Sequence, residues 1–402
     1  MDRREFLIAA AAAAASAGVS ADTGSPTPSS ETAEELSLQD IAAAFADGRL
    51  SSQQLTQMYL SRIDRLDKHG PALGAVIEVN SRALEIAAAL DAERKSRGPR
   101  GPLHGVPILI KDNVETADRM MTTAGSLALE GWYAPHDARV ADRLRAAGAV
   151  ILGKTNLSEW ANFRSTHSSS GWSGRGGQTL NPYAANRTPS GSSSGSAAAV
   201  AANLCAIAVG TETDGSIVSP ASINGIVGLK PTVGLVSRRG IVPISHSQDT
   251  AGPLARSVRD AALMLTAMAG LDAADAASAA VGSRFDNDYA RYVDPMGLRG
   301  ARLGIARKFF ADNAPLNAFL DHCIEMLKGA GAIIIDPADL PMHGSFGAAE
   351  QDVLLFEFKA DLNSYLRRLP PTFPVRSLAA LIRFNDAHRD REMPRFDQEL
   401  LR

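Results

Sequence analysis

Short apolar runs alternate with segments of helical periodicity along much of this chain, and this alternation limits the folds open to it. Apolar runs of strand length occupy residues 76–79, 106–110, 149–152 and 204–209. Segments with helical character precede or separate these runs, at residues 38–66, 83–95, 138–147 and 197–203. Strands that alternate with helices are typical of an α/β domain. We therefore predict an α/β fold with a mixed or mostly parallel sheet.

Local signals add detail to this pattern. The helical segment 38–66 is interrupted at Asp47-Gly48, and Ser51 is well placed to cap a second helix, so we expect a helical hairpin. Further units are expected near the C-terminal end, at residues 302–306, 316–328, 333–335 and 389–401. No internal repeat is visible.

Composition restricts the class of protein. Hydrophobic residues make up 45% of the 402 positions and charged residues 21%, which is the balance of an ordinary soluble globular chain. The formal net charge of −3 offers no basic field for nucleic acid, so no nucleic-acid partner is expected. Cys205 and Cys323 are too few for a disulfide framework, and we interpret both as core thiols.

The N-terminus carries a targeting pattern. Arg3-Arg4 precedes an apolar stretch over residues 8–19, and small residues follow at Val19-Ser20-Ala21. An Ala-rich amphipathic or membrane helix is the alternative, but the stretch is short for a span of about 20 residues. We predict a twin-arginine export signal over residues 1–21, a flexible linker over 22–35 and a single domain over 36–402. The expected location is periplasmic or secreted, with no stable membrane span once the signal is removed.

Two serine-containing glycine turns and one lysine form the main chemical signal. Gly191 to Ser196 precedes a small apolar helix, and Thr211 to Ser216 follows the next apolar run. Lys111 ends the strand-like run 106–110, and strand ends are where α/β proteins place chemistry. A serine becomes a nucleophile only when a base removes its proton. No histidine is obviously placed for that role, which leaves a lysine acting through a second serine.

The run from Gly191 to Ser196 has three interpretations. A flexible linker is seldom flanked by an apolar helix and an apolar strand. A phosphate cradle of the Walker type would need a lysine that Gly195-Ser196-Ala197 lacks. A catalytic turn is favoured, because Ser216 and Lys111 lie in two other segments that could converge on it.

Other residues compete for the same roles. Lys154 also follows an apolar strand and is a rival base, while Ser193 or Ser194 could replace Ser192 through an error of register. Asp249 beside His246 could suggest a Ser-His-Asp triad, but no Gly-x-Ser-x-Gly elbow precedes them. We interpret these two as loop or pocket residues.

Together these motifs resemble the amidase signature family of serine hydrolases over roughly residues 36–270. The matching segments occur in the family's order, at 105–113, 191–194, 211–216, 228–232 and 248–253. Asp214 and Val218 stand where the usual variant has glycine and arginine, and this difference is similar to the peptide amidase branch.

The resemblance implies an amidase signature fold, with a central mixed β-sheet covered by helices on both faces. It implies Ser216 as the acylated nucleophile, Ser192 as the bridging serine and Lys111 as the base. The backbone N–H groups that match the family's oxyanion hole are those of Thr213, Asp214, Gly215 and Ser216. Family members hold the bridging serine on a cis peptide bond, here Gly191-Ser192, and the pKa of Lys111 would have to fall towards 7 or 8. No metal or cofactor is implied.

The implied reaction is hydrolysis of a small-molecule or peptide amide with release of ammonia, from peptide C-terminal amides or related compounds. Family members usually continue past the equivalent of Leu400 into a further helix and a core strand, whereas this sequence stops at Arg402. We therefore expect a sheet that lacks its C-terminal strand. Two alternatives stay open: a truncated non-catalytic homologue, and a protein like the A component of an amidotransferase that modifies charged tRNA, which shares the same triad.

Overall fold

The computed structural model describes residues 33–282, 284–342 and 344–402. The predicted export signal at 1–21 and the linker residues up to 32 lie outside this described part. Ala33 is buried and Glu34 forms an ion pair with Arg62 at 2.5 Å, so residues 33–35 already pack on the domain.

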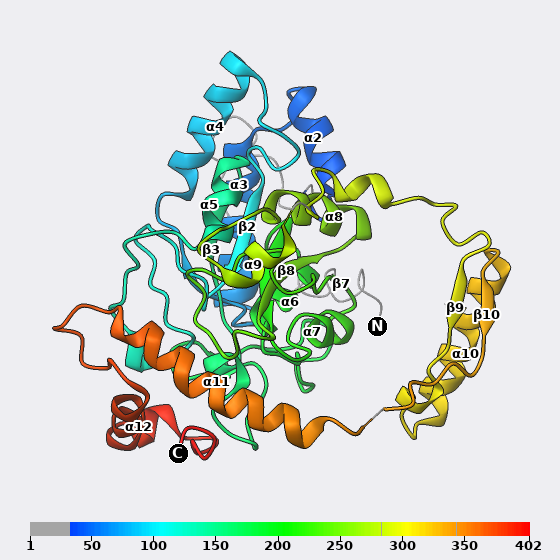
Figure 1. Ribbon diagram of the computed structural model, residues 1–402. Coiled ribbons are helices and arrows are strands. Elements are labelled where there is room, and N and C mark those ends of the chain that lie inside the picture. The colour runs from blue at the N-terminus through cyan, green and yellow to red at the C-terminus, as the bar shows by residue number, and fades with distance from the viewer. Residues whose placement is uncertain (1–32, 283, 343) are drawn as a thin grey trace.

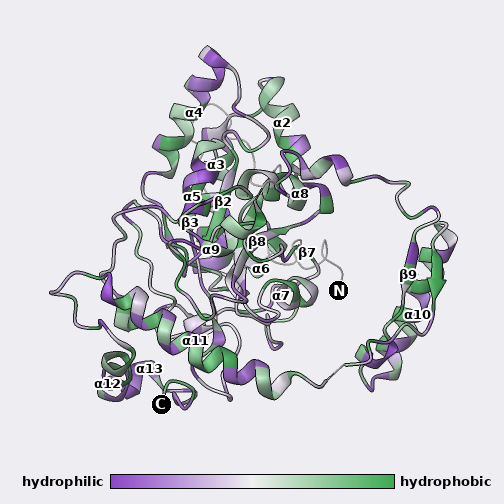
Figure 2. Ribbon diagram, viewed as in Figure 1, coloured by the Kyte–Doolittle hydropathy of each residue, from purple (hydrophilic) through white to green (hydrophobic). Residues whose placement is uncertain are grey.

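A six-stranded mixed sheet forms the centre of the molecule, in the order β1-β3-β2-β6-β8-β7. Its strands are β1 (Val76–Val79), β2 (Pro107–Lys111), β3 (Val150–Thr155), β6 (Ile207–Glu212), β7 (Val227–Gly228) and β8 (Thr250–Ala255). The strands β3, β2 and β6 run parallel, while β1, β8 and β7 each pair antiparallel with a neighbour. Every residue of β2, β3, β6 and β8 is buried, so both faces of the sheet are covered, and Figures 1 and 2 show the helices around these apolar strands. The predicted α/β class and mixed central sheet are confirmed.

Helices from the chain up to residue 281 surround this sheet (Figure 1). They are α2 (Leu38–Ala46), α3 (Ser52–Arg62), α4 (Ala83–Arg97), α5 (Arg139–Ala146), α6 (Ser194–Ala201), α7 (Val218–Ile223), α8 (Val258–Met268) and α9 (Ala276–Val281). The expected helical hairpin is present as α2 and α3, and Ser51 caps α3 by accepting a hydrogen bond from the backbone N–H of Gln54. A π-helical turn, Ile63–Lys68, extends α3.

Helix α6 brings the serine-rich turn to the sheet. All eight of its residues are buried, and all are small apart from Val200. It lies against β2, β3, β6 and β8, because small side chains let the helix approach the strands closely. Gly195 is required there, since a Cβ at this position would lie 2.2 Å from the carbonyl oxygen of Ala75.

Strand β6 begins three residues later than the apolar run suggested. Leu204 to Ala206 form the connection from α6, and the backbone N–H of Leu204 donates to Ala199 at the end of that helix. Cys205 is buried in this connection. The interpretation of Cys323 as a core thiol is wrong, because it lies half-buried on α10 (Ala314–Gly329).

The last hundred residues form two further parts. A two-stranded parallel sheet, β9 (Arg302–Gly304) and β10 (Ile333–Ile335), packs with α10 and stands away from the main body in Figure 1. The long helix α11 (Gly347–Arg367) crosses the lower edge of the body in Figure 1, where Leu354, Phe358 and Leu362 pack in an apolar cluster with Trp160 and Phe163.

Two short helices complete the chain, α12 (Leu378–Ala387) and α13 (Arg389–Glu392). The helix expected over 389–401 is therefore wrong beyond Glu392. Pro394 accounts for this, because a proline disfavours helical geometry in the residue before it. Within the described ranges, no helix combines the length and apolar character needed to cross a membrane.

Candidate active site

Lys111 ends β2 inside the protein, with no exposed side-chain surface. Its Nζ lies 2.7 Å from Ser192 Oγ, 3.1 Å from Ser193 Oγ and 2.9 Å from Thr211 Oγ1. The lysine amine therefore meets hydroxyl groups from both serine-containing segments, with no carboxylate in direct contact among the described residues.

Burial sets the charge state of this lysine. Removal from water lowers the pKa of Lys111 to about 7, while the negative charges of Asp249 and Glu212 oppose the shift. A desolvated amine loses its proton more readily because the charged form is no longer hydrated. A large fraction of Lys111 is thus neutral at physiological pH and able to accept a proton.

The Ser192 turn joins Lys111 to the second glycine turn. The Gly191-Ser192 peptide bond is cis, as the sequence resemblance implied. The backbone N–H of Ser193 donates to the carbonyl oxygen of Ser216 at 3.2 Å. The two serine-containing turns, 24 residues apart in the chain, are therefore adjacent in space.

The Ser216 turn follows β6 and is held by a buried carboxylate. Glu212 Oε2 accepts hydrogen bonds from the backbone N–H groups of Ile217 at 2.7 Å and Val218 at 3.0 Å. Gly215 adopts a φ of +76°, a conformation that favours glycine. Ser216 is 8% exposed, and its Oγ has no hydrogen-bond partner within the described ranges.

The turn also presents free backbone donors. The N–H groups of Thr213, Asp214, Gly215 and Ser216 donate to no acceptor in the part of the chain that the structure describes. Several unpaired N–H groups beside a serine hydroxyl are the arrangement that stabilises a developing oxyanion.

Sequence reasoning missed three residues that support this arrangement, Thr211, Asn113 and Glu212. Asn113 Nδ2 donates to Thr211 Oγ1 at 2.9 Å. Ser193, considered only as a substitute for Ser192, donates to the carbonyl oxygen of Thr211 at 3.0 Å and accepts from its N–H at 3.2 Å. All of these residues lie within or next to the recognised motifs, but their contacts depend on how the strands align.

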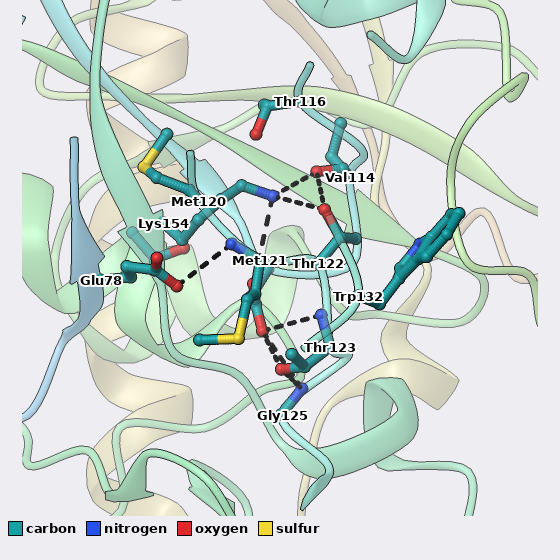
Figure 3. Close-up of polar contacts among 12 residues, drawn as sticks. Glu78, Val114, Thr116, Met120, Met121, Thr122, Thr123, Gly125, Trp132 and Lys154 are labelled. Carbon is teal, nitrogen blue, oxygen red and sulfur yellow. Dashed lines mark hydrogen bonds and ion pairs between the residues drawn. The ribbon is translucent and has the colours of Figure 1, made fainter. Parts of the chain in front are cut away.

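Lys154, the rival base, has a different environment (Figure 3). Its Nζ donates to the carbonyl oxygen of Val114 at 2.6 Å and to Thr122 Oγ1 at 2.9 Å, and it lies 4.0 Å from Asp112 Oδ1. No serine of either turn contacts it among the described residues. Burial lowers the pKa of Lys154, but the nearby Asp112 carboxylate favours its charged form. Lys154 therefore belongs to a separate buried polar cluster.

His246 and Asp249 lie in the loop before β8. Asp249 Oδ1 accepts a hydrogen bond from Thr213 Oγ1 at 2.5 Å, so this carboxylate adjoins the Ser216 turn. The imidazole of His246 points elsewhere, with Nδ1 2.9 Å from Asp361 and Nε2 3.2 Å from Glu357 on α11. Among the described residues, His246, Glu357 and Asp361 form a group with donor atoms that could hold a metal ion, but the His246 ring already pairs with both carboxylates. His246 and Asp249 therefore do not form a triad with Ser216.

Known proteins are similar to this chain in sequence. The amidase family model matches residues 54–396. A probable amidase from Arabidopsis thaliana is 47% identical over 367 residues, which cover 89% of this chain and 69% of the relative. The A component of glutamyl-tRNA(Gln) amidotransferase from Methylobacillus flagellatus is 42% identical over 303 residues, covering 75% of this chain and 59% of the relative.

Solved structures are also similar. The native peptide amidase from Stenotrophomonas maltophilia superimposes with a TM-score of 0.88 at 54% identity, covering 94% of this chain and 75% of that one. The peptide amidase PAM in complex with the competitive inhibitor chymostatin gives a TM-score of 0.89 at 55% identity, covering 92% and 75%.

Proposed function

The chain belongs to the amidase signature family, and from this premise we propose that it hydrolyses peptide C-terminal amides or related small amides, with release of ammonia. The observation that carries the proposal is the 2.7 Å contact between Lys111 Nζ and Ser192 Oγ, buried beside the Ser216 turn. The similarity to solved peptide amidases supports this substrate class over the tRNA-linked substrate of an amidotransferase.

In the proposed cycle, neutral Lys111 accepts a proton from Ser192, and Ser192 accepts one from Ser216. Ser216 Oγ then attacks the amide carbonyl carbon. The N–H groups of residues 213–216 stabilise the oxyanion, and donors of this kind are worth about 3 kcal/mol each. Ser192 returns a proton to the departing nitrogen, which leaves as ammonia, and an acyl ester remains on Ser216.

Water resolves the acyl-enzyme through the same groups. Ser192 accepts a proton from the attacking water, with Lys111 as the final acceptor. The C–O ester bond breaks, the carboxylic acid leaves and Ser216 recovers its proton. Every proton transfer is thus assigned to a side chain of this protein.

Substitution of the nucleophile tests the proposal. Ser216→Ala should abolish ammonia release from amidated peptides and should also abolish covalent labelling by a fluorophosphonate. In the unmodified protein, chymostatin should slow both reactions. Ser219→Ala is the matched control, because Ser219 lies three residues further along in the same region but hydrogen bonds through its Oγ to Ser190 at 2.8 Å. Equal labelling of Ser216→Ala and the unmodified protein would exclude Ser216 as the nucleophile.

Export is a second part of the proposal. Residues 1–21 have the twin-arginine pattern described above, and they lie outside the described part of the structure. A reporter fused after residue 35 should reach the periplasm, and Arg3→Lys with Arg4→Lys should retain it in the cytoplasm. An unchanged distribution would contradict a twin-arginine signal.

A further inference from the structure

The loop from Ile244 to Asp249 is held on one side by the Ser216 turn. The Asp249 carboxylate makes this connection, because its Oδ1 accepts from Thr213 Oγ1 at 2.5 Å. Its Oδ2 accepts from the backbone N–H groups of Ile244 at 2.9 Å and Ser245 at 3.0 Å. One carboxylate therefore fixes the shape of its own loop and also holds the first residue of the turn.

The same loop is held on its other side by α11. Glu357 Oε2 accepts from Ser245 Oγ, from Ser247 Oγ at 2.9 Å and from the Ser247 N–H at 3.1 Å. The His246 backbone N–H donates to Asp361 at 2.9 Å, and Gln248 Nε2 donates to Glu350 at 2.8 Å. Three acidic residues of α11 thus bind four consecutive loop residues, 245–248.

We propose that Asp249 is a positioning residue for amide hydrolysis, which holds the oxyanion-binding turn at 213–216 through the hydroxyl of Thr213. This inference rests on the proposed function. Within the described ranges these four N–H groups make no helix or strand hydrogen bond. The turn is held instead by the contacts of Asp249 and Glu212 and by two backbone hydrogen bonds to the carbonyl oxygens of residues 215 and 216. Oxyanion donors act only when they point at the position where negative charge develops.

The negative charge of Asp249 also acts on the pKa of Lys111, and this effect can be measured separately from the position of the turn. Its carboxylate is the first of the two negative groups that raise the pKa of Lys111, the other being Glu212. It shares a small cavity with Asn113, Thr211 and Thr213, of which Thr211 contacts Lys111 Nζ. The other charged or titratable side chains that share a pocket wall with Asp249 are Arg238, Arg239, His246, Asp275, Asp361, Tyr365 and Arg368. Loss of the carboxylate would therefore act on Lys111 as well as on the turn.

The test compares Asp249→Asn, Thr213→Val and the double variant, with Thr213→Ser retaining the hydroxyl. Each single variant should lower kcat by about 10- to 100-fold, the size of effect that a misplaced catalytic group produces, with KM changed less than about threefold. The double variant should be no slower than the slower single one, because both substitutions alter the same contact between residues 213 and 249. Thr213→Ser should recover most of kcat.

The pH profile separates positioning from a general loss of structure. Burial raises the pKa of Asp249 to about 6, so its carboxylate is negative near Lys111 only above that pH. Asp249→Asn should move the acid limb of kcat/KM above pH 6 to lower pH, because Lys111 loses this negative neighbour. Thr213→Val should move that limb less, because it removes a hydrogen bond that lowers the pKa of Asp249 but leaves the carboxylate itself in place. Asp142→Asn is the matched control, since Asp142 lies on α5 with a side chain that is 54% exposed and pairs with Arg139.

Fluorophosphonate labelling keeps the two proposals distinguishable. If the unmodified protein is labelled but releases no ammonia from amides, the proposed function fails, while labelling rates of the variants still report on the turn. If it is neither labelled nor active, both proposals fail. Full kcat and labelling rate in Thr213→Val would overturn the positioning role, even if Asp249→Asn does not fold. Additive losses in the double variant would overturn it too.

Discussion

Lys111 and Lys154 lie at the ends of neighbouring parallel strands as fully buried lysines, and both bind a carbonyl oxygen and a threonine hydroxyl, but only Lys111 contacts serine hydroxyls and only Lys154 lies beside a carboxylate. Lys111 Nζ meets the hydroxyls of Ser192, Ser193 and Thr211, whereas Lys154 Nζ binds a carbonyl oxygen and a threonine hydroxyl close to the Asp112 carboxylate. A nearby carboxylate keeps an amine charged, and hydroxyl groups without a carboxylate do so far less. This difference explains why Lys111 is the proposed base and Lys154 is not.

Activity should follow the protonation of Lys111. Because the pKa of this lysine is about 7, kcat/KM should fall about tenfold per pH unit below that value and level off above it. The measurement is ammonia release from one amidated peptide between pH 5 and 9. A flat profile across that range would contradict a lysine base, and Lys111→Arg should be inactive throughout, since arginine stays protonated.

The same lysine should affect stability. Its pKa is about 7 in the folded protein and 10.5 is its ordinary value, so between these limits the unfolded chain binds more protons. The free energy of unfolding of the wild type should then rise with pH relative to Lys111→Met, by about 1.4 kcal/mol per pH unit. Urea unfolding of both proteins at pH 7.5 and 9.5 measures the difference. Parallel pH dependence in the two proteins would mean that Lys111 is charged in the fold.

Ser192 and Ser193 both touch Lys111, and substitution should separate their roles. Ser192→Ala should lower kcat by more than about a thousandfold, because the proposed proton path is lost. Ser193→Ala should cost about 10- to 100-fold, since Ser193 only orients Lys111 and Thr211. Single-turnover acylation rates give the comparison. The reverse order would assign the bridging role to Ser193.

Much of this site could be predicted from sequence because its main elements are local. The run that ends in Lys111 is a continuous apolar segment, and a buried parallel strand has that signature. The glycine-rich turn before α6 is marked by residue type alone. Both features are present in the structure, and their boundaries differ from the predicted ones by only a few residues.

The supporting contacts could not be predicted in the same way. Thr211 lies 100 residues from Lys111, and Glu357 lies 112 residues from Ser245. Whether such groups meet depends on strand order and on the path of α11, which no local pattern encodes. For this reason Asp249 could be placed in a loop or pocket, but its contact with Thr213 could not be foreseen.

The polar cluster around Lys154 should contribute to stability rather than to chemistry. Lys154→Met leaves the buried Asp112 carboxylate with Arg175 as its remaining cation neighbour, so the loss of stability should be smaller than the about 3–5 kcal/mol of a buried carboxylate left without any partner. Adding Asp112→Asn should recover part of the loss, although Arg175 also lies 3.5 Å from this carboxylate. Urea unfolding of the single and double variants measures the effect. An equally stable Lys154→Met protein would show that the pair is not needed.

A second buried cluster should make the free energy of unfolding fall as pH rises, which is opposite to the effect expected of Lys111. Glu159, Arg164 and Glu392 have no exposed side-chain surface, and the Glu159 carboxylate binds Arg164 and accepts from the Gly174 N–H at 2.6 Å. Burial, and then the neighbouring Glu392, raise the pKa of Glu159 well above its ordinary value of 4.5. The folded protein therefore holds this proton to higher pH than the unfolded chain does. Its stabilising contribution is complete below about pH 4.5 and is lost as pH rises through the raised pKa.

Glu159→Gln imitates the protonated form and should remove this part of the pH dependence. Between pH 5 and 8 the free energy of unfolding of the variant should fall less steeply than that of the wild type. Glu325→Gln is the matched control, because Glu325 pairs with Lys328 on the exposed side of α10. Unfolding curves in urea at intervals of one pH unit give the comparison, and a slope in Glu159→Gln equal to that of the control would mean that Glu159 is ionised in the folded protein.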